Sequence, residues 1–131
     1  YTIDTGNCKV SVATDTGHIT KSMLVNMSKS EAVLIEANHD VDMIKNGKYP
    51  YMLKKRILSD DGHLSNDNAA WLATQLAQWG TKKIILGHLS DKNNTPEKAY
   101  GAAVKKLEEN DIKVNSDVIL KVASKNQICM V

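Results

Sequence analysis

Residues 60–90, DDGHLSNDNAAWLATQLAQWGTKKIILGHLS, begin and end with copies of one tetrapeptide, Gly-His-Leu-Ser. Between the copies, residues 66–78 place apolar side chains at helical spacing and predict a helix with Asn66 as its N-cap. The run Ile-Ile-Leu at residues 84–86 predicts a short buried strand bounded by glycine. His63 therefore precedes a helix, and His88 follows the C-terminal end of a strand, which is where ligands collect in open α/β sheets.

The composition is that of a single domain with an aliphatic core. A chain of 131 residues can bury roughly two-thirds of its unfolded surface. With 17 basic and 15 acidic residues, the net charge of +2 excludes a general electrostatic attraction to nucleic acids or membranes. No apolar run approaches the roughly 20 residues of a membrane helix. Cys8 and Cys129 lack zinc-binding spacing, so we expect free thiols in a soluble cytoplasmic protein, a disulfide being the alternative.

The N-terminus looks like the interior of a longer sequence. The chain opens on Tyr1 rather than Met and enters a turn at residues 4–7 directly from a strand-like run. We therefore expect residues 1–131 to be a single truncated domain, a fragment or processed piece of something longer.

The other predicted elements complete an α/β pattern. Residues 1–14 read as a hairpin, with alternation over residues 9–14. The order β-β-α-β-α-α-α-β-α-β-β predicts a mixed sheet with flanking helices. The remaining elements are helices at residues 18–27, 41–48, 50–58 and 95–109, and strands at residues 31–36, 112–114 and 118–122.

Groups that bind metals or move protons follow three of the predicted strands. Asp15 follows the second strand, and His88 follows the fourth. The end of the third strand carries Glu36, Asn38, His39 and Asp40. His63 adds a second loop histidine. If the sheet brings these ends together, imidazoles and carboxylates share one rim, which suits zinc or manganese.

Each of these residues also has a purely structural interpretation. Asp15 before a Thr-Gly pair is typical of a helix cap or an Asx-turn. His39 can cap the next helix, and the loop histidines can bond to backbone. The Lys54-Lys55-Arg56 run is more typical of a solvated helix face than of a phosphate site. Only the coincidence of these groups at strand ends and loops favours a functional site.

Four separated motifs together resemble the second half of a metallo-β-lactamase-fold hydrolase, and most closely the YycJ/WalJ-like group. The resemblance extends from Tyr1 to about Ala103, and the tRNA-processing nuclease RNase Z shows a similar arrangement more distantly. The motifs are Ala-Thr-Asp-Thr-Gly at residues 13–17, Glu-Ala-Asn-His-Asp at 36–40, Gly-His-Leu-Ser-Asn at 62–66 and Leu-Gly-His-Leu-Ser at 86–90, with Tyr-Pro-Tyr at 49–51 and Leu-Lys-Lys-Arg-Ile-Leu at 53–58.

This resemblance implies the C-terminal half of an αββα sandwich that holds two metal ions at one edge. Asp15 would be the aspartate that bridges the metals, and His88 the last histidine ligand. His63 would face substrate phosphate. Glu36 aligns with the glutamate of a His-Glu-Ala-Thr motif, whose histidine is replaced by isoleucine here, so a proton-donor role would pass to His39, four residues later.

The resemblance further implies a metal-dependent phosphodiesterase or nuclease. Two zinc or manganese ions would activate a water and stabilise the charge that develops on a phosphoryl oxygen. Lys54, Lys55 and Arg56 would contact substrate phosphates without reading bases. The family's first signature, His-x-His-x-Asp-His, is missing from the chain. Asp15 and His88 alone fall short of the roughly three protein ligands of a catalytic zinc, so we expect this piece to bind little metal and to be inactive alone.

Two alternatives stay open. The chain can be a non-catalytic structural or binding half-domain that pairs with its missing half, or with itself as a homodimer, through exposed apolar surface. The same metal chemistry would also serve a hydrolase of small esters, thioesters or lactams.

Overall fold

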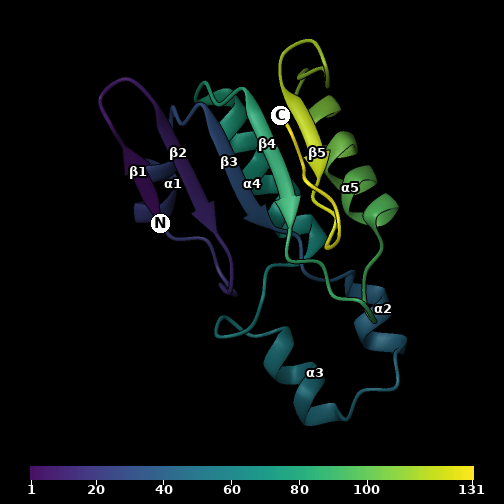
Figure 1. The fold of residues 1–131 in the computed structure, drawn as a ribbon. Helices are drawn as coiled ribbons and strands as arrows, with labels where there is room; N and C mark the ends of the chain where they lie inside the picture. Colours follow the sequence, from purple (N-terminus) through teal and green to yellow (C-terminus); the bar gives the residue numbers. More distant parts are fainter.

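Five strands lie in chain order across one sheet (Figure 1). The computed structural model describes all residues from 1 to 131. β1 (Thr2–Asp4) pairs antiparallel with β2 (Lys9–Ala13), which confirms the predicted hairpin. β3 (Ala32–Glu36), β4 (Lys83–Gly87) and β5 (Ile119–Val122) continue the sheet parallel to β2. The predicted α/β class with a mixed sheet and flanking helices is confirmed.

The five helices divide into two groups. In Figure 1, α1, α4 and α5 lie along one face of the sheet, whereas α2 and α3 lie beyond the C-terminal ends of β3 and β4. None of the helices combines the length and the apolar composition that crossing a bilayer requires. Their bounds are Lys21–Met27 for α1, Val41–Asn46 for α2, Tyr51–Ile57 for α3, Asn66–Gln78 for α4 and Pro96–Glu108 for α5.

The core lies between the sheet and its helix-covered face. Alternate residues of the central strands point into it, because successive side chains of a strand lie on opposite faces. Alanines on the facing surfaces of α4 and α5 let these two helices pack closely. The fully buried members include Val33, Ile35, Ile84 and Leu86 from the strands, Ala69, Leu72, Ala73 and Leu76 from α4, and Ala99, Ala103 and Leu107 from α5.

No helix covers the opposite face of the sheet. Cross-strand neighbours Val12, Leu34 and Ile85 share that face, and Val12 is 41% exposed. On the edge strand Ile3 is 64% exposed. A sheet with helices on one face and apolar residues on the other is the arrangement expected of half a sandwich.

Three details differ from the predictions. Ile112 to Val114 do not form a strand, because Asn115 adopts a left-handed conformation and Val114 pairs with Val118 only through an isolated bridge. α4 is capped by Ser65, whose Oγ accepts from the Asn68 N–H, and not by Asn66. α1 begins three residues later than predicted, at Lys21, with Thr20 as its N-cap.

The loop before α4 requires glycine at position 62. A Cβ at Gly62 would lie 2.2 Å from the Ile57 carbonyl oxygen, whereas one at Gly101 in α5 would meet nothing within 4 Å. Gly62→Ala should therefore lower the free energy of unfolding by more than about 1 kcal/mol, since backbone must move. Gly101→Ala should raise it by about 0.5–1 kcal/mol. Urea denaturation of both variants tests this; equal midpoints would contradict the close approach.

Candidate active site

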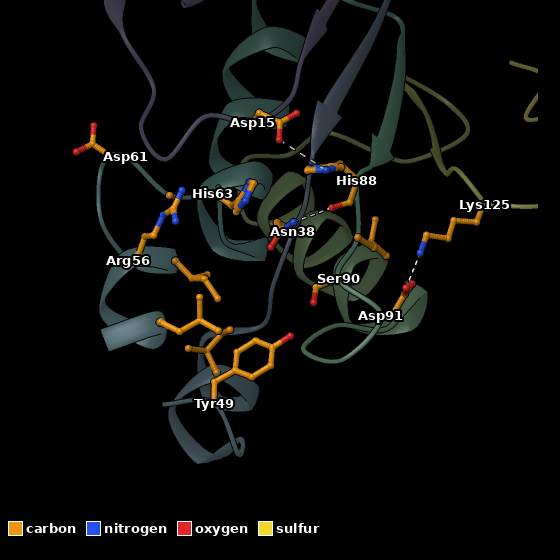
Figure 2. Close-up of a pocket in the computed structure, with 15 residues that line it drawn as sticks. Asp15, Asn38, Tyr49, Arg56, Asp61, His63, His88, Ser90, Asp91 and Lys125 are labelled. Atoms are coloured by element: carbon orange, nitrogen blue, oxygen red, sulfur yellow. Dashed lines mark hydrogen bonds and ion pairs between the residues drawn. The ribbon is translucent and has the colours of Figure 1, made fainter. Parts of the chain in front are cut away.

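A cavity of about 680 Å³ opens at the edge of the sheet where β2, β3 and β4 end (Figure 2). Asp15, His63 and His88 lie at one end of it, and Tyr49 lies at the other. The carboxyl ends of parallel strands meet at this edge, which is why residues far apart in sequence come together. The structure brings the side chains of Asp15, His63 and His88 together on this rim, as the sequence predicted.

Asp15 and His88 share an unusual backbone conformation. Their φ angles are 57° and 53°, in the left-handed region that few residues other than glycine adopt. Each residue follows the end of its strand, so the turn comes where the chain leaves the sheet. Such strain persists only where the surroundings hold it in place, and it is frequent at functional sites.

The buried carboxylate of Glu36 holds this end of the cavity together. Glu36 ends β3 and is 0% exposed. Three backbone N–H groups and two imidazoles surround it. Its Oε2 accepts hydrogen bonds from Asp15 N at 2.9 Å, His88 Nδ1 at 2.6 Å and His63 Nδ1 at 3.2 Å. Its Oε1 accepts from Leu64 N at 2.7 Å and Thr16 N at 3.3 Å.

These bonds orient both histidines. A carboxylate only accepts, so each Nδ1 bonded to Glu36 carries a proton, which leaves Nε2 free to accept a proton or bind a metal. His88 Nε2 lies 3.8 Å from Asp15 Oδ1, and the rings of His63 and His88 are 5.4 Å apart. One ligand atom from each of these three residues lies within 4.8 Å of the others. Imidazole nitrogen and carboxylate oxygen are ligand types that zinc accepts, and a second carboxylate, Glu36, orients both imidazoles.

His39 does not line the cavity. Its side chain is 1% exposed, and Nδ1 has no hydrogen-bond partner. Burial, together with the nearby His63, lowers the pKa of His39 below the ordinary value of 6.5, so the ring is neutral at pH 7. Its carbonyl accepts from Asn66 N at 2.9 Å. The next residue, and not His39, caps α2: Asp40 Oδ1 accepts from Met43 N at 2.8 Å.

The predicted phosphate-binding run is divided by the geometry of α3. Arg56 lines the cavity, whereas Lys54 and Lys55 border a separate surface hollow. Lys54 Nζ donates to the Lys45 carbonyl at 2.7 Å. The structure thus brings one of the three predicted cations to the site.

Contacts across long sequence separations also shape the cavity. Asn38 joins the two histidine loops: its Nδ2 donates to the His88 carbonyl at 2.9 Å, and its N–H donates to the Leu64 carbonyl at 2.9 Å. Lys125 reaches the cavity from the segment after β5 and pairs with Asp91. These contacts span long sequence separations, so no local pattern indicates them. Asn38, in the polar group that follows β3, and Tyr49, in the Tyr-Pro-Tyr motif, carried a sequence signal, whereas Lys125 carried none.

Curated proteins similar to the chain include exodeoxyribonuclease WalJ of Streptococcus pneumoniae serotype 2 (strain D39 / NCTC 7466). It is 44% identical over 104 residues, which are 79% of this chain and 39% of the relative. The chain is thus a homologue of part of the YycJ/WalJ-like proteins. WalJ of S. pneumoniae strain ATCC BAA-255 / R6 gives the same values. Exodeoxyribonuclease YycJ of Bacillus anthracis is 39% identical over 109 residues, 83% of this chain and 41% of the relative.

The similarity confirms the group that the motifs indicated. The chain spans about two-fifths of the length of these curated relatives. No protein-family model matches it.

Replacing Glu36 by Gln should weaken the hydrogen bonds that orient both His63 and His88. Gln keeps the size of Glu but turns an NH₂ toward groups that donate, so we expect a loss on the order of 3 kcal/mol in unfolding free energy. The ¹⁵N shifts of His63 and His88 should lose the signature of a fixed Nδ1–H tautomer. Glu31→Gln is the control, since the Glu31 carboxylate lies at the surface, where it accepts from Lys83 Nζ at 3.4 Å and from Cys8 Sγ at 3.5 Å. Matching unfolding curves for the two variants would contradict the bracing role.

His39 makes stability depend on pH. The unfolded chain binds a proton at His39 at a higher pH than the folded chain does, so protonation favours unfolding. The stability that neutral His39 contributes is present above about pH 6.5 and is lost as the pH falls below that value toward the folded pKa. His39→Gln removes this titration and should flatten the fall in stability below pH 6.5. Urea unfolding across this range tests it; an unchanged slope in the variant would contradict it.

Proposed function

We propose that this chain supplies one side of the active site of a metal-dependent exodeoxyribonuclease of the metallo-β-lactamase fold. The observation that carries the proposal is the cluster of Asp15, His63 and His88 around buried Glu36 at the strand ends. The names of the curated relatives, exodeoxyribonucleases WalJ and YycJ, supply the reaction and the substrate class. Hydrolysis of phosphodiester bonds in DNA is the proposed activity.

In this proposal Asp15 and His88 are metal ligands, and the metal is zinc or manganese. When bound, two such ions would make hydroxide available near neutral pH. A catalytic zinc takes about three ligands from protein, so the remaining ligands would come from sequence outside these residues. The chain alone would bind metal weakly. A longer protein that includes the part its relatives have in addition would complete the site.

The other cavity residues have distinct proposed tasks. His63 donates a hydrogen bond from Nδ1 to Glu36, and its Nε2, when it also carries a proton, would donate to a phosphate oxygen or pass that proton to the leaving oxygen. Arg56 would bind phosphate from the α3 side of the cavity. Glu36 would act by orienting both imidazoles. Lys54 and Lys55, which lie outside the cavity, would steer DNA toward it. A role for buried His39 would be indirect.

A second candidate function is a non-catalytic half-domain. The observation that favours it is the uncovered sheet face, where Ile3 is 64% and Val12 41% exposed. A second copy or a separate half would cover this face. The face is equally explained if the rest of a longer nuclease packs there, so sedimentation of the chain decides whether it pairs with itself.

The nuclease proposal is tested on the longer protein with end-labelled DNA. Asp15→Asn and His88→Gln should each lower kcat/KM on the order of 100-fold or more, and a chelator should abolish hydrolysis. Asp111→Asn is the matched control, because Asp111 is an exposed aspartate outside the cavity with a left-handed φ of 60°. The isolated chain should show little activity.

The outcomes separate the alternatives. Full activity in both cavity variants would overturn the assignment of the ligands. Metal-dependent turnover of esters, thioesters or lactams without cleavage of DNA would favour the small-molecule hydrolase. Inactivity toward every substrate, with a dimeric chain, would favour the half-domain.

A further inference from the structure

The cavity has two chemically different ends. The end at Asp15, His63 and His88 is polar and charged (Figure 2). The other end lies against the segment that contains α2 and α3, where Figure 2 shows Tyr49 reaching toward the side of Ser90. All five apolar residues of the lining belong to this segment or to the loop after β4, namely Ile44, Tyr49, Leu53, Ile57 and Leu89.

Most of the apolar end is not part of the hydrophobic core, although Leu89 packs against that core. Ile44 is 1% exposed but lies outside the core cluster formed by the sheet and its helices. α3 buries none of its residues, and Leu53 is 39% exposed. Apolar side chains that the core does not use, gathered along one side of a cavity, form a wall for a ligand.

This wall includes one aromatic ring, that of Tyr49. Tyr49 is half-buried beside α3, and the Lys92 Nζ lies 6.0 Å from the centre of its ring. A cation at this distance is attracted to the ring and favours a fixed position for it. Lys92 does not line the cavity, so the Tyr49 ring stays available to a ligand inside the cavity.

We propose that this end of the cavity is a nucleobase subsite, in which Tyr49 stacks on the unpaired terminal base of a DNA strand. The inference rests on the proposed function and extends it to a substrate class, the single-stranded DNA end. A nucleotide joins an anionic phosphate to a flat, largely apolar base, and this cavity joins an imidazole-bearing end to an aromatic one, with Arg56 in the lining as a cation for the phosphate. Its volume of about 680 Å³ lies within the usual range for small-molecule sites.

The subsite accepts any base. Stacking on an aromatic side chain uses the π-face that every base has. The subsite therefore binds a nucleotide with an unpaired base more tightly than one without a base, whichever base it is. A base in a duplex stays stacked on its neighbours, which makes single-stranded ends the better substrate. Removal of a stacking side chain of this kind weakens binding by roughly tenfold or more per base.

Binding to the chain itself tests the subsite without any need for catalysis. Thymidine 5′-monophosphate and 2-deoxyribose 5-phosphate differ only by the base, and their affinities are measured by NMR titration. The nucleotide should bind roughly tenfold or more tightly in the wild type and in Tyr49→Phe, and Tyr49→Ala should remove the difference while sparing the sugar phosphate. Tyr51→Ala is the control, because Tyr51 is 76% exposed and lies outside the cavity.

Equal affinities in the wild type, or a preference that survives Tyr49→Ala, would overturn the subsite. A thermal melt of each variant shows whether it is folded, and Tyr49→Phe keeps the ring should Tyr49→Ala fail to fold.

Cleavage by the longer protein separates this inference from the proposed function. With a subsite, a strand that ends in an abasic nucleotide should be cleaved about tenfold more slowly than an intact one, and Tyr49→Ala should equalise the two. If intact and abasic ends are cleaved at the same rate, the subsite is wrong and the nuclease stands. If no DNA is cleaved but the nucleotide preference is found, the nuclease is wrong and the subsite stands.

Discussion

A single buried carboxylate organises the edge of the sheet. Burying an ionised carboxylate costs several kcal/mol unless its oxygens are satisfied, and Glu36 is fully buried. The N–H groups of Asp15, Thr16 and Leu64 and the rings of His63 and His88 satisfy it. The loops after β2 and β4 and the loop before α4 therefore have a common anchor. The positions of these loops relative to one another follow because one buried charge needs hydrogen-bond donors from all three.

This anchor also explains why strained backbone is tolerated. Left-handed φ angles at Asp15 and His88 are unfavourable for residues with a Cβ. At Asp15 the strain comes with a hydrogen bond from its own N–H to Glu36, and at His88 with a 2.6 Å bond from the ring to the same carboxylate. The bonds to a charged acceptor offset the strain, since they are among the stronger ones in proteins. The backbone of Asp15 and the ring of His88 are consequently held at this end of the cavity before any ligand arrives.

The parts of this arrangement that the sequence predicts are the local ones. Apolar patterns together with turn and capping signals indicated every strand of the sheet and all five helices, besides a strand at residues 112–114 that does not form. Position after a strand was enough to bring Asp15, Glu36 and His88 to one rim. The residues that sequence reasoning missed act across long separations. Asn66 read as a helix cap, but its amide pairs with Asn94 at 2.8 Å in both directions, a contact between α4 and the segment before α5. Tyr49 and Lys125 reach the cavity only because the chain folds back on itself.

The hydrogen bonds that fix the site at the edge of the sheet are independent of the sheet's uncovered face. The hydrogen bonds that fix the two histidines come from Glu36 at the end of β3 and from Asn38 in the following loop. The Asn66–Asn94 amide pair fixes the neighbouring loop, where Asn94 Nδ2 donates to the Ala37 carbonyl at 2.7 Å. None of these contacts involves the uncovered face of Val12, Leu34 and Ile85. A partner or a further part of a longer protein could cover that face without rearranging the rim. A half-site that is to be completed from outside needs side chains that are already fixed at the edge of the sheet. It also needs an apolar face on which the completing part can pack.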